Sequence, residues 1–434
     1  MAGEKLRFDT LKVRGGYDPK ENNFSVSVPI YQSAAFDLGN TERASKLFSF
    51  SEFGFIYTRV GNPTVAVLER RVAELDDAAG AVALGSGMAA LTYTLFNLAE
   101  GGGRILTTPR LYGGTFDSFK KIYPKFGIEI DYAEDPDDPA SFENAIKDDT
   151  KAIFVETISN PNGAIADIEA LSEIAHNHNI PLVVDNTFAT PYLLNPFKFG
   201  TDIIVYSATK ALNGHGNVIA GLVLESGKFN WANGKFPQFT EPQYTLRDFN
   251  GKERSILDVF PQFPFTARIR NNYLAYFGAA LGPFDAYLTL IGLETLSERI
   301  RKQVSSTEKL IQYLEGKKEV AWIKYPLAKG SPYKLLAEKY LPKGAGSVFT
   351  FGFNGTDDQL NKFLDSVKIF SFHANVGDAR SLIINSPKTT HGELTKEEQN
   401  RAGITSDTIR ISVGLEDPDD LIEDLEQAFN KAFD

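Results

Sequence analysis

Six short, continuous apolar runs alternate with helix-patterned segments between residues 66 and 225. Uninterrupted Val, Ile and Leu runs are typical of strands buried on both faces, because a strand with one solvated face shows polar residues at every second position. The runs are GAVAL, RILTT, KAIFVE, IPLVVD, TDIIVYS and IAGLVLE. Helical segments between such strands serve as crossovers, so the pattern predicts an α/β domain with a mostly parallel sheet.

The 434 residues fall into segments of different composition, and their number favours two or three domains. Residues 1–65 carry Gly, Pro and Asn without helical periodicity, which indicates an extended arm. Residues 66–285 form the predicted large domain, in which an aromatic and Pro-rich stretch at about 228–280 is interpreted as an insertion or lid. Residues 286–434 form a smaller α/β domain. There GSVFTFGF and DTIRISVGLE alternate like strands, and a final helix begins near Pro418.

Charge and composition point to a small-molecule partner. The formal net charge is −11 and no basic run occurs, whereas nucleic acids and anionic membranes require clustered Lys and Arg. The absence of cysteine excludes disulfides, thiolate metal sites and thiol nucleophiles. Among the five histidines, His176 and His178 are two residues apart and would point to different helix faces, so we expect no metal site.

The chain also lacks the sequence features of export and membrane insertion. No apolar run approaches the roughly 20 residues that span a bilayer. The N-terminal sequence MAGEKLRFDTLKVRGG mixes charges with single apolar residues and has no signal-peptide core. We therefore expect a cytoplasmic protein.

Three predicted strand ends carry residues that could do chemistry. They are Gly87, Met88, Asp185, Ser207, Thr209 and Lys210. In α/β folds, ligands bind outside the carboxyl ends of the strands, where these groups would meet. A glycine turn at a helix start offers N–H groups to an anion. Together with hydroxyls, a carboxylate and an amine, it matches pyridoxal 5'-phosphate, which needs a lysine for its aldehyde and a carboxylate at its ring nitrogen.

The same residues have other interpretations. GSGMAA also fits the loose dinucleotide pattern G-x-G-x-x-A, although the next run, RILTT, ends in threonines rather than in the acidic residue that holds a ribose. Taken alone, Asp185 could cap a turn and Lys210 could be a solvated surface lysine. A nicotinamide oxidoreductase and a cofactor-free binding protein therefore remain alternatives to a pyridoxal-phosphate enzyme.

Eight segments resemble the cystathionine γ-synthase-like enzymes of cysteine and methionine metabolism. In chain order they are YTRVGNPT, GSGMAA, LYGGT, ETISNP, VDNTFATP, YSATKALNGHGNVIAG, SPKTTH and IRISVGLE. The similarity extends from about residue 25 to the C-terminus. It implies a fold-type I pyridoxal-phosphate transferase with a mostly parallel large domain, a smaller α/β C-terminal domain and an N-terminal arm that reaches a neighbouring subunit. In this family the arm makes an obligate homodimer, usually paired into a homotetramer.

The resemblance also implies roles around the cofactor. Lys210 would hold it covalently and move protons, and Asp185 would pair with its pyridinium nitrogen. Tyr112 would stack on the ring. The phosphate ligands would be Gly87, Met88, Ser207 and Thr209, joined across the interface by Tyr57 and Arg59. The catalytic set would be Lys210, Tyr112 and Tyr57.

Three further residues would hold the substrate in this resemblance. Asn160 would lie near the 3'-oxygen of the cofactor and the substrate, and Ser381 and Arg410 would bind the α-carboxylate. The alternation in TIRISVGLE places Arg410 opposite Ile409 and Ile411, but it leaves open whether that face meets solvent or the site. Without the family context, Tyr57 and Tyr112 could equally be core aromatics.

Within the family, two features favour the O-acetylhomoserine sulfhydrylase branch. One is the insertion with FPQFTEP, followed by RIRNNYLAYFGAALGPFDAYLTLIGLETL. The other is Gly113, where the methionine γ-lyases usually carry a cysteine. The expected reaction joins O-acetylhomoserine and sulfide to give homocysteine and acetate in methionine biosynthesis. A γ-lyase and a cystathionine γ-synthase are the alternatives on the same fold, and Gly216 in GHGNV departs from the serine that the family often has.

Overall fold

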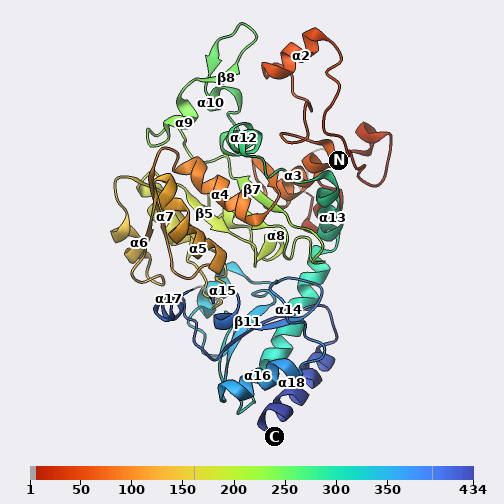
Figure 1. Ribbon diagram of the computed structural model, residues 1–434. Coiled ribbons are helices and arrows are strands. Elements are labelled where there is room, and N and C mark those ends of the chain that lie inside the picture. Colours follow the sequence, from red (N-terminus) through yellow and green to blue (C-terminus); the bar gives the residue numbers. More distant parts are fainter. Residues whose placement is uncertain (1–5, 161, 393) are drawn as a thin grey trace.

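The computed structural model describes residues 6–160, 162–392 and 394–434, and its larger unit is built on a seven-stranded sheet (Figure 1). The strand order is β1-β7-β6-β5-β4-β2-β3. All neighbours are parallel except β7, which is antiparallel to both β1 and β6. The strands are β1 (Gly80–Leu84), β2 (Gly103–Thr107), β3 (Ile128–Tyr132), β4 (Thr150–Glu156), β5 (Leu182–Asp185), β6 (Ile203–Ser207) and β7 (Gly221–Glu225). All six predicted strands are present, and the expected fold class is confirmed.

The seventh strand, β3, was not predicted. Its sequence IEIDY alternates apolar with acidic residues and lacks a continuous apolar run. β3 lies at the edge of the sheet and pairs only with β2, so it is less covered than the central strands. An edge strand needs fewer apolar residues, which is why the search for continuous apolar runs missed it.

Helices cover both faces of this sheet (Figure 1). Successive strand residues enter two separate clusters, as Val183 does on one face and Leu182 and Val184 do on the other. This two-sided burial explains the continuous apolar runs. The surrounding elements are α3 (Pro63–Asp76), α4 (Gly87–Leu98), α5 (Gly113–Lys121), η2 (Tyr123–Phe126), α6 (Pro139–Ala145), α7 (Ile168–Asn177), α8 (Thr190–Leu193), η3 (Pro196–Phe199) and α13 (Pro283–Glu294).

The predicted insertion contributes several aromatic side chains to the core. Trp231 stacks on Phe239 at 4.4 Å and on Phe265 at 5.1 Å between ring centroids, and all three are buried. The β8–β9 hairpin projects outward (Figure 1). The insertion contains α9 (Pro237–Thr240), β8 (Gln243–Arg247), β9 (Glu253–Arg254), α10 (Ile256–Val259), α11 (Pro264–Arg268), the π-helix η4 (Ile269–Leu274) and α12 (Ala275–Phe277).

The C-terminal unit carries a four-stranded antiparallel sheet in the order β10-β11-β13-β12. β11 and β13 are the two strands predicted by alternation, and α18 begins at Pro418 as expected. The elements are α14 (Leu296–Leu314), β10 (Val320–Lys324), α15 (Lys334–Tyr340), β11 (Val348–Phe353), α16 (Asp357–Ser366), β12 (Leu382–Asn385), η5 (Ser386–Lys388), α17 (Lys396–Arg401), β13 (Thr408–Ser412) and α18 (Pro418–Phe433).

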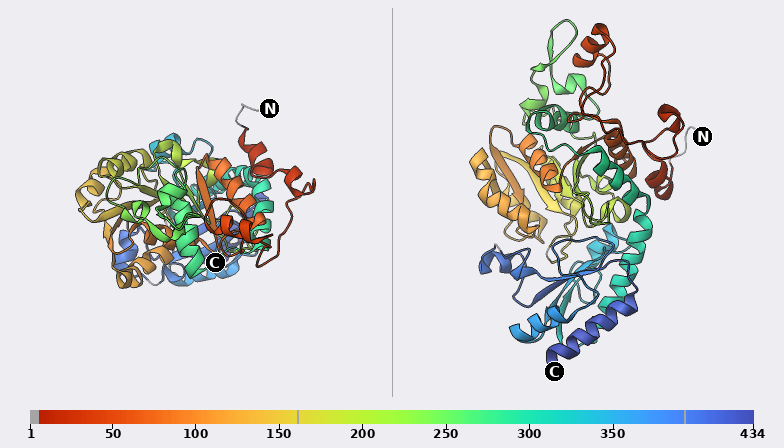
Figure 2. Two further views of the ribbon diagram at one scale, coloured as in Figure 1. Left: turned by 90° about the horizontal axis from the view of Figure 1, so that it is seen from above. Right: turned by 45° about the vertical axis from the view of Figure 1, so that its right-hand side comes forward.

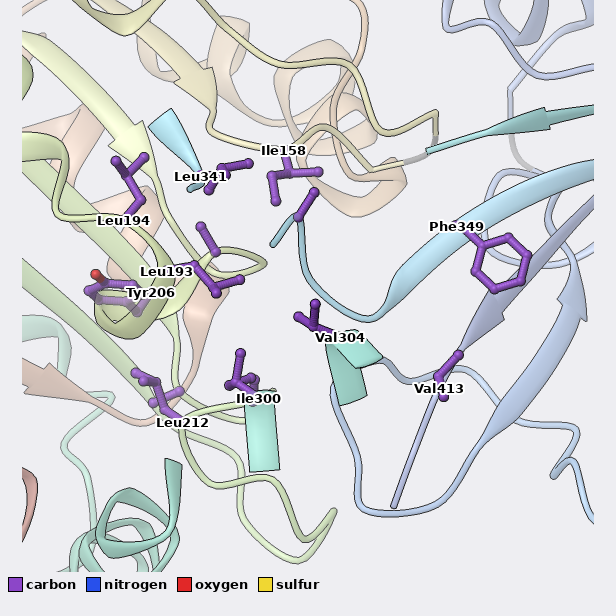
Figure 3. Close-up of a cluster of buried hydrophobic side chains, with 14 of the residues drawn as sticks. Ile158, Leu193, Leu194, Tyr206, Leu212, Ile300, Val304, Leu341, Phe349 and Val413 are labelled. Atoms are coloured by element: carbon purple, nitrogen blue, oxygen red, sulfur yellow. The ribbon is translucent and has the colours of Figure 1, made fainter. Parts of the chain in front are cut away.

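The two units share one apolar core. Figure 3 shows Ile300 and Val304 of α14 beside Leu193, Leu212 and Ile158 of the large unit. These residues belong to a single buried cluster that continues to α18. The predicted division between residues 285 and 286 falls inside α13, which packs on α3, and α14 then carries the chain to the second sheet.

The predicted arm is partly helical, and its first five residues lie outside the described range. α1 (Phe8–Arg14) packs on α3 and α13, η1 (Pro19–Asn22) follows, and α2 (Thr41–Phe48) projects away from the body next to the β8–β9 hairpin (Figures 1 and 2). Several large apolar side chains on this stretch are exposed, namely Phe24, Val26, Phe48, Phe53 and Tyr57. Across the described residues, no helix combines the length and apolar character needed to cross a membrane.

Candidate active site

The carboxyl ends of β4, β5 and β6 lie side by side and deliver three polar side chains. Glu156 pairs with Asp185 across β4 and β5, and Ser207 ends β6. Thr187 joins the last two strands: its backbone N–H donates to Asp185 Oδ1 at 2.9 Å, and its hydroxyl accepts from Ser207 N at 2.8 Å. The three strand ends therefore meet at one edge of the sheet, as expected.

The start of α4 lies beside the end of β6. Ser86 caps the helix by accepting from Ala89 N at 3.0 Å, which leaves the N–H groups of Gly87 and Met88 without helical acceptors. Gly87 lies so close to Ser207 that a Cβ atom on it would be 2.6 Å from Ser207 Cβ. Glycine is therefore required for this approach. Free N–H groups at the positive end of a helix dipole form an anion site.

Two hydroxyls lie near this helix start. No hydrogen bond of the Ser207 hydroxyl is found among the described residues, so it is available to a ligand. The Thr209 hydroxyl accepts from Ala220 N at 2.9 Å and donates to the Ala220 carbonyl at 3.2 Å. Its hydrogen is therefore used within the chain and would have to turn from the carbonyl to bind a ligand.

Glu156 and Asp185 are two buried carboxyl groups at neighbouring positions. Burial raises the pKa of Asp185, and burial together with the charge of Asp185 raises the pKa of Glu156 to about 8. Neither carboxylate has a cationic side-chain partner among the described residues. Burial therefore disfavours the ionised form of both carboxyl groups, and a cationic ring nitrogen beside them would favour it.

Glu156 also holds two other candidate residues in place. Its carboxylate accepts from Tyr112 N at 2.7 Å and from Asn160 N at 2.8 Å. Tyr112 stands at the start of α5, and its side chain is 43% exposed, so it is not the core aromatic that the sequence alone allowed. Asn160 is buried, and Pro161, which follows it in the SNP motif, lies outside the described residues.

Lys210 reaches from the turn after β6 toward the C-terminal unit. Its ammonium group donates to Asn375 Oδ1 at 2.9 Å. Burial and the nearby charge of Arg410 lower the pKa of Lys210 to about 8. A substantial fraction of this amine is therefore neutral near physiological pH and able to act as a nucleophile or base.

Arg410 lies inside the molecule, which resolves the question that alternation left open. The side chain is 2% exposed and comes from β13 in the C-terminal sheet. It donates to Asn160 Oδ1 at 3.2 Å and to the Asn375 carbonyl at 3.1 Å, while its buried Nε has no partner. Burial lowers its pKa to about 10. A guanidinium without a carboxylate partner in the described chain is suited to bind an anionic ligand.

Three predicted residues are not in this cluster. The hydroxyl of Ser381 donates to Glu416 at 2.8 Å and accepts from Gly414 N at 2.8 Å, so its hydrogen-bonding groups are already used. Tyr57 and Arg59 are exposed on the arm, where the guanidinium of Arg59 lies 5.2 Å from the Tyr57 ring centroid. No hydrogen bond or ion pair of the Arg59 side chain occurs within the described residues.

Sequence reasoning missed Glu156 and Asn375. Glu156 ends the run KAIFVE, so the rule that selected Asp185 at the next strand end would have selected it too. Asn375 gave no such signal, because it lies in a loop of the C-terminal unit and far along the chain from Lys210. Its carbonyl and amide oxygens accept from Arg410 and Lys210 respectively, so it links both cations.

The dinucleotide alternative does not fit the topology. A dinucleotide-binding unit requires the strand before the glycine turn to be flanked by parallel strands. β1 lies at the sheet edge, and its neighbour β7 is antiparallel to it. The glycine turn therefore serves the strand ends of β4–β6 rather than a nucleotide fold.

Comparisons with known proteins agree with this architecture. A family model described as Cys/Met metabolism PLP-dependent enzyme matches residues 9–430. The O-acetyl-L-homoserine sulfhydrylase 1 of Thermus thermophilus is 40% identical, covering 98% of this chain and 100% of that protein.

Two solved structures are similar to this chain in both fold and sequence. An O-acetylhomoserine (thiol)-lyase structure from Campylobacter jejuni, with N'-pyridoxyl-lysine-5'-monophosphate, has a TM-score of 0.92 and 38% identity, covering 98% of this chain and 100% of that one. A cystathionine gamma-lyase from Lactobacillus plantarum has a TM-score of 0.82 and 29% identity, covering 99% and 100%. The architecture is that of the fold-type I enzymes. The chain belongs to the Cys/Met metabolism PLP-dependent enzyme family.

Proposed function

We propose that this protein is an O-acetylhomoserine (thiol)-lyase, which uses pyridoxal 5'-phosphate to convert O-acetyl-L-homoserine and sulfide to L-homocysteine and acetate. The observation that carries the proposal is the network that connects Lys210, Arg410 and Asp185 through Asn375, Asn160 and Glu156. An amine, a carboxylate and a guanidinium match the aldehyde, the ring nitrogen and the substrate α-carboxylate respectively. The relatives named as O-acetylhomoserine sulfhydrylases support the choice of reaction.

The residues at the site fit the cofactor. The N–H groups of Gly87 and Met88, which lack helical acceptors, and the Ser207 hydroxyl suit its phosphate. Thr209 would join them by turning its hydroxyl hydrogen from the Ala220 carbonyl to the phosphate. A protonated ring nitrogen would favour the ionised form of Asp185, whose pKa burial raises. We assign the ring nitrogen to Asp185 and the aldehyde to the Lys210 amine.

When bound, pyridoxal phosphate supplies an electron sink for negative charge that develops on the substrate carbon atoms. Asp185 would hold a proton at the ring nitrogen, and Tyr112 would cover the ring. The Lys210 amine would move protons at Cα and Cβ of the substrate. Its pKa of about 8 allows it both to accept and to donate a proton near neutral pH. The bond from Cγ to the acetate oxygen then breaks, and a bond from Cγ to sulfur forms.

Arg410 and Asn160 provide the binding geometry in this proposal. The guanidinium can offer two parallel N–H groups to the α-carboxylate, including the Nε that now lacks a partner. Asn375 holds that guanidinium through its carbonyl, and Glu156 holds Asn160 through its backbone N–H. Ser381 stays a predicted carboxylate ligand, and its hydroxyl is hydrogen-bonded to Glu416 and Gly414 N in this structure.

The surroundings of Gly113 support the replacement branch over a γ-lyase. A Cβ atom at this position would overlap the Thr390 carbonyl oxygen. The cysteine that the lyases usually carry here would therefore require the 389–391 segment to move. The identity and TM-score are also higher for the solved O-acetylhomoserine (thiol)-lyase than for the cystathionine gamma-lyase.

We further propose a homodimer that shares its active sites, paired into a homotetramer in the cytoplasm. The free guanidinium of Arg59 and the exposed Tyr57 are available to a neighbouring subunit, where they would bind the cofactor phosphate. The exposed apolar side chains on the same arm also call for a partner surface. Among them, Val26 is 84% exposed.

A product assay tests the proposed reaction. Purified holoenzyme would receive O-acetylhomoserine with sulfide, and separately methionine or cystathionine alone, while homocysteine and 2-oxobutyrate are measured. We expect homocysteine to dominate and the Lys210→Ala variant to make none. Dominant 2-oxobutyrate from methionine or cystathionine would assign the protein to the γ-lyases instead. Replacing sulfide by cysteine distinguishes the cystathionine-forming alternative.

A further inference from the structure

The β8–β9 hairpin and the helix after it contact the arm of their own chain. Arg254 on β9 donates to the Ser49 carbonyl at 2.7 Å. The ring of Phe260 lies 5.5 Å from that of Phe50 and 6.0 Å from that of Phe53, measured between centroids. Figures 1 and 2 show the hairpin and α2 side by side in different orientations. These contacts hold the segment that follows α2.

A second contact holds the arm on the other side of Tyr57 and Arg59. Arg270, in the π-helix, donates to the Val60 carbonyl at 2.8 Å. The same guanidinium forms an ion pair with Glu69 at 2.7 Å, and Glu69 accepts from Ala83 N at 2.8 Å. Val60 is therefore fixed to the body of the large unit.

The segment between these contacts carries the exposed pair. Residues 54–59 are held between the Ser49–Phe53 contacts and the Val60 contact. Inside the segment, Tyr57 pairs with Ala35, and Thr58 N donates to the Ala34 carbonyl at 2.8 Å. The backbone is thus fixed while the side chains of Tyr57 and Arg59 remain exposed. A segment that is fixed at both ends loses less conformational entropy when its side chains bind a ligand.

We infer that Arg254, Phe260 and Arg270 are positioning residues for the active site of the neighbouring subunit. They act through the arm of their own chain by holding Tyr57 and Arg59 in the geometry that binds the cofactor phosphate. The inference rests on the proposed function, because it requires the arm to act in trans. The insertion would then help to form an active site, although it contains none of the residues assigned to the cofactor or the substrate.

Hybrid enzymes test this inference. One chain carries Arg59→Ala and keeps Lys210, while the other carries Lys210→Ala and keeps the arm. Co-expression with two affinity tags isolates the hybrid. Its one complete site combines the lysine of the first chain with the arm of the second. Recovery of activity in this parent hybrid supports the arm in trans.

Arg254→Ala is then added to either chain of the parent hybrid. On the chain that supplies the arm, we expect a roughly tenfold loss of activity, the size expected for losing one charged hydrogen bond that positions a segment. On the chain that supplies the lysine, we expect no loss, because its arm is already disabled. The matched control is Arg247→Ala, which removes a hairpin arginine paired with Glu253 at 2.8 Å and without contact to the arm.

Cofactor retention gives a second readout. In the homomeric enzyme, Arg254→Ala should release pyridoxal phosphate several-fold faster than Arg247→Ala in cofactor-free buffer, and Arg254→Lys should recover part of the retention. Equal losses on both chains of the hybrid, or no loss on either, would overturn the positioning role while leaving the arm in trans intact. An inactive parent hybrid with proven subunit pairing would overturn both the inference and the shared site.

Discussion

Lys210 and Arg410 are two cations in one buried region, and within the part of the chain that the structure describes neither pairs with a carboxylate. Asn375 accepts a hydrogen bond from each, so it relieves part of their desolvation without adding negative charge. Burial, and then the charge of Arg410, lower the pKa of Lys210. The same arrangement leaves the Nε–H of Arg410 without a partner and available to an anion. A carboxylate substrate would therefore also relieve the repulsion between these side chains.

The first prediction concerns the pH dependence of cofactor capture by the apoenzyme. Only the neutral amine of Lys210 attacks an aldehyde, so the rate should rise with pH through a midpoint near 8. Arg410→Gln removes a cation that disfavours the charged amine, so the midpoint should move to higher pH. Arg410→Lys should keep it nearly unchanged. Stopped-flow measurement of pyridoxal phosphate binding across pH would check this, and an unchanged midpoint in Arg410→Gln would contradict it.

At the scale of single residues, the sequence predicted most of the residues that meet at the strand ends of the large domain. It predicted little about their pKa values. Asp185, Ser207 and Lys210 were found because strand ends meet at one sheet edge. Arg410 was placed only through resemblance, since alternation in TIRISVGLE does not reveal what covers either face. Asn375 could not be predicted, because its contacts depend on how the second sheet packs against the first.

The ends of helices and strands position the residues of the candidate site. α5 begins directly after Tyr112, and its first turn lies against the 389–391 segment of the C-terminal unit. Glu156 holds the same end through Tyr112 N. The position of Tyr112 is therefore set by a strand end, a helix start and a loop from the other unit. Continuous apolar runs predicted the central strands, whereas the edge strand β3 was missed because solvent covers part of it.

The second prediction tests this helix start. In Gly113→Cys the added side chain would overlap the Thr390 carbonyl oxygen, so the 389–391 segment must shift. We expect kcat/KM for O-acetylhomoserine to fall about tenfold or more, as overpacking of a fitted contact does, without new 2-oxobutyrate from methionine. Steady-state kinetics with both substrates would check this. Gly316→Ala is the control, since a Cβ there meets only ordinary contacts. Gain of lyase activity would refute the steric argument.

At the scale of the whole molecule, the exposed apolar side chains of the arm support the proposed homodimer. Phe24 and Val26 are 75% and 84% exposed, on a segment that also leads to Tyr57 and Arg59. The sequence predicted the arm from its lack of periodicity. It could not predict that α1 packs on the body, because a helix of seven residues carries too weak a pattern.

The third prediction concerns assembly. Val26→Asp would bury a charge in the proposed interface, so the dimer should dissociate at least about tenfold more readily, equivalent to about 1.4 kcal/mol. Light scattering and activity measured over a dilution series would check this. Leu335→Asp changes a side chain that is 79% exposed on α15, outside the arm, and should leave both unchanged. Identical dilution curves for the two variants would argue against the arm as the interface.

The apolar cluster that both units share should make unfolding cooperative. Because Ile300 and Val304 of α14 pack among residues of the large unit, a break between α13 and α14 would expose apolar faces on both fragments. Neither fragment would then be a stable domain. The two sheets should melt in one transition, so a destabilising change in the second sheet also threatens the site that holds Lys210.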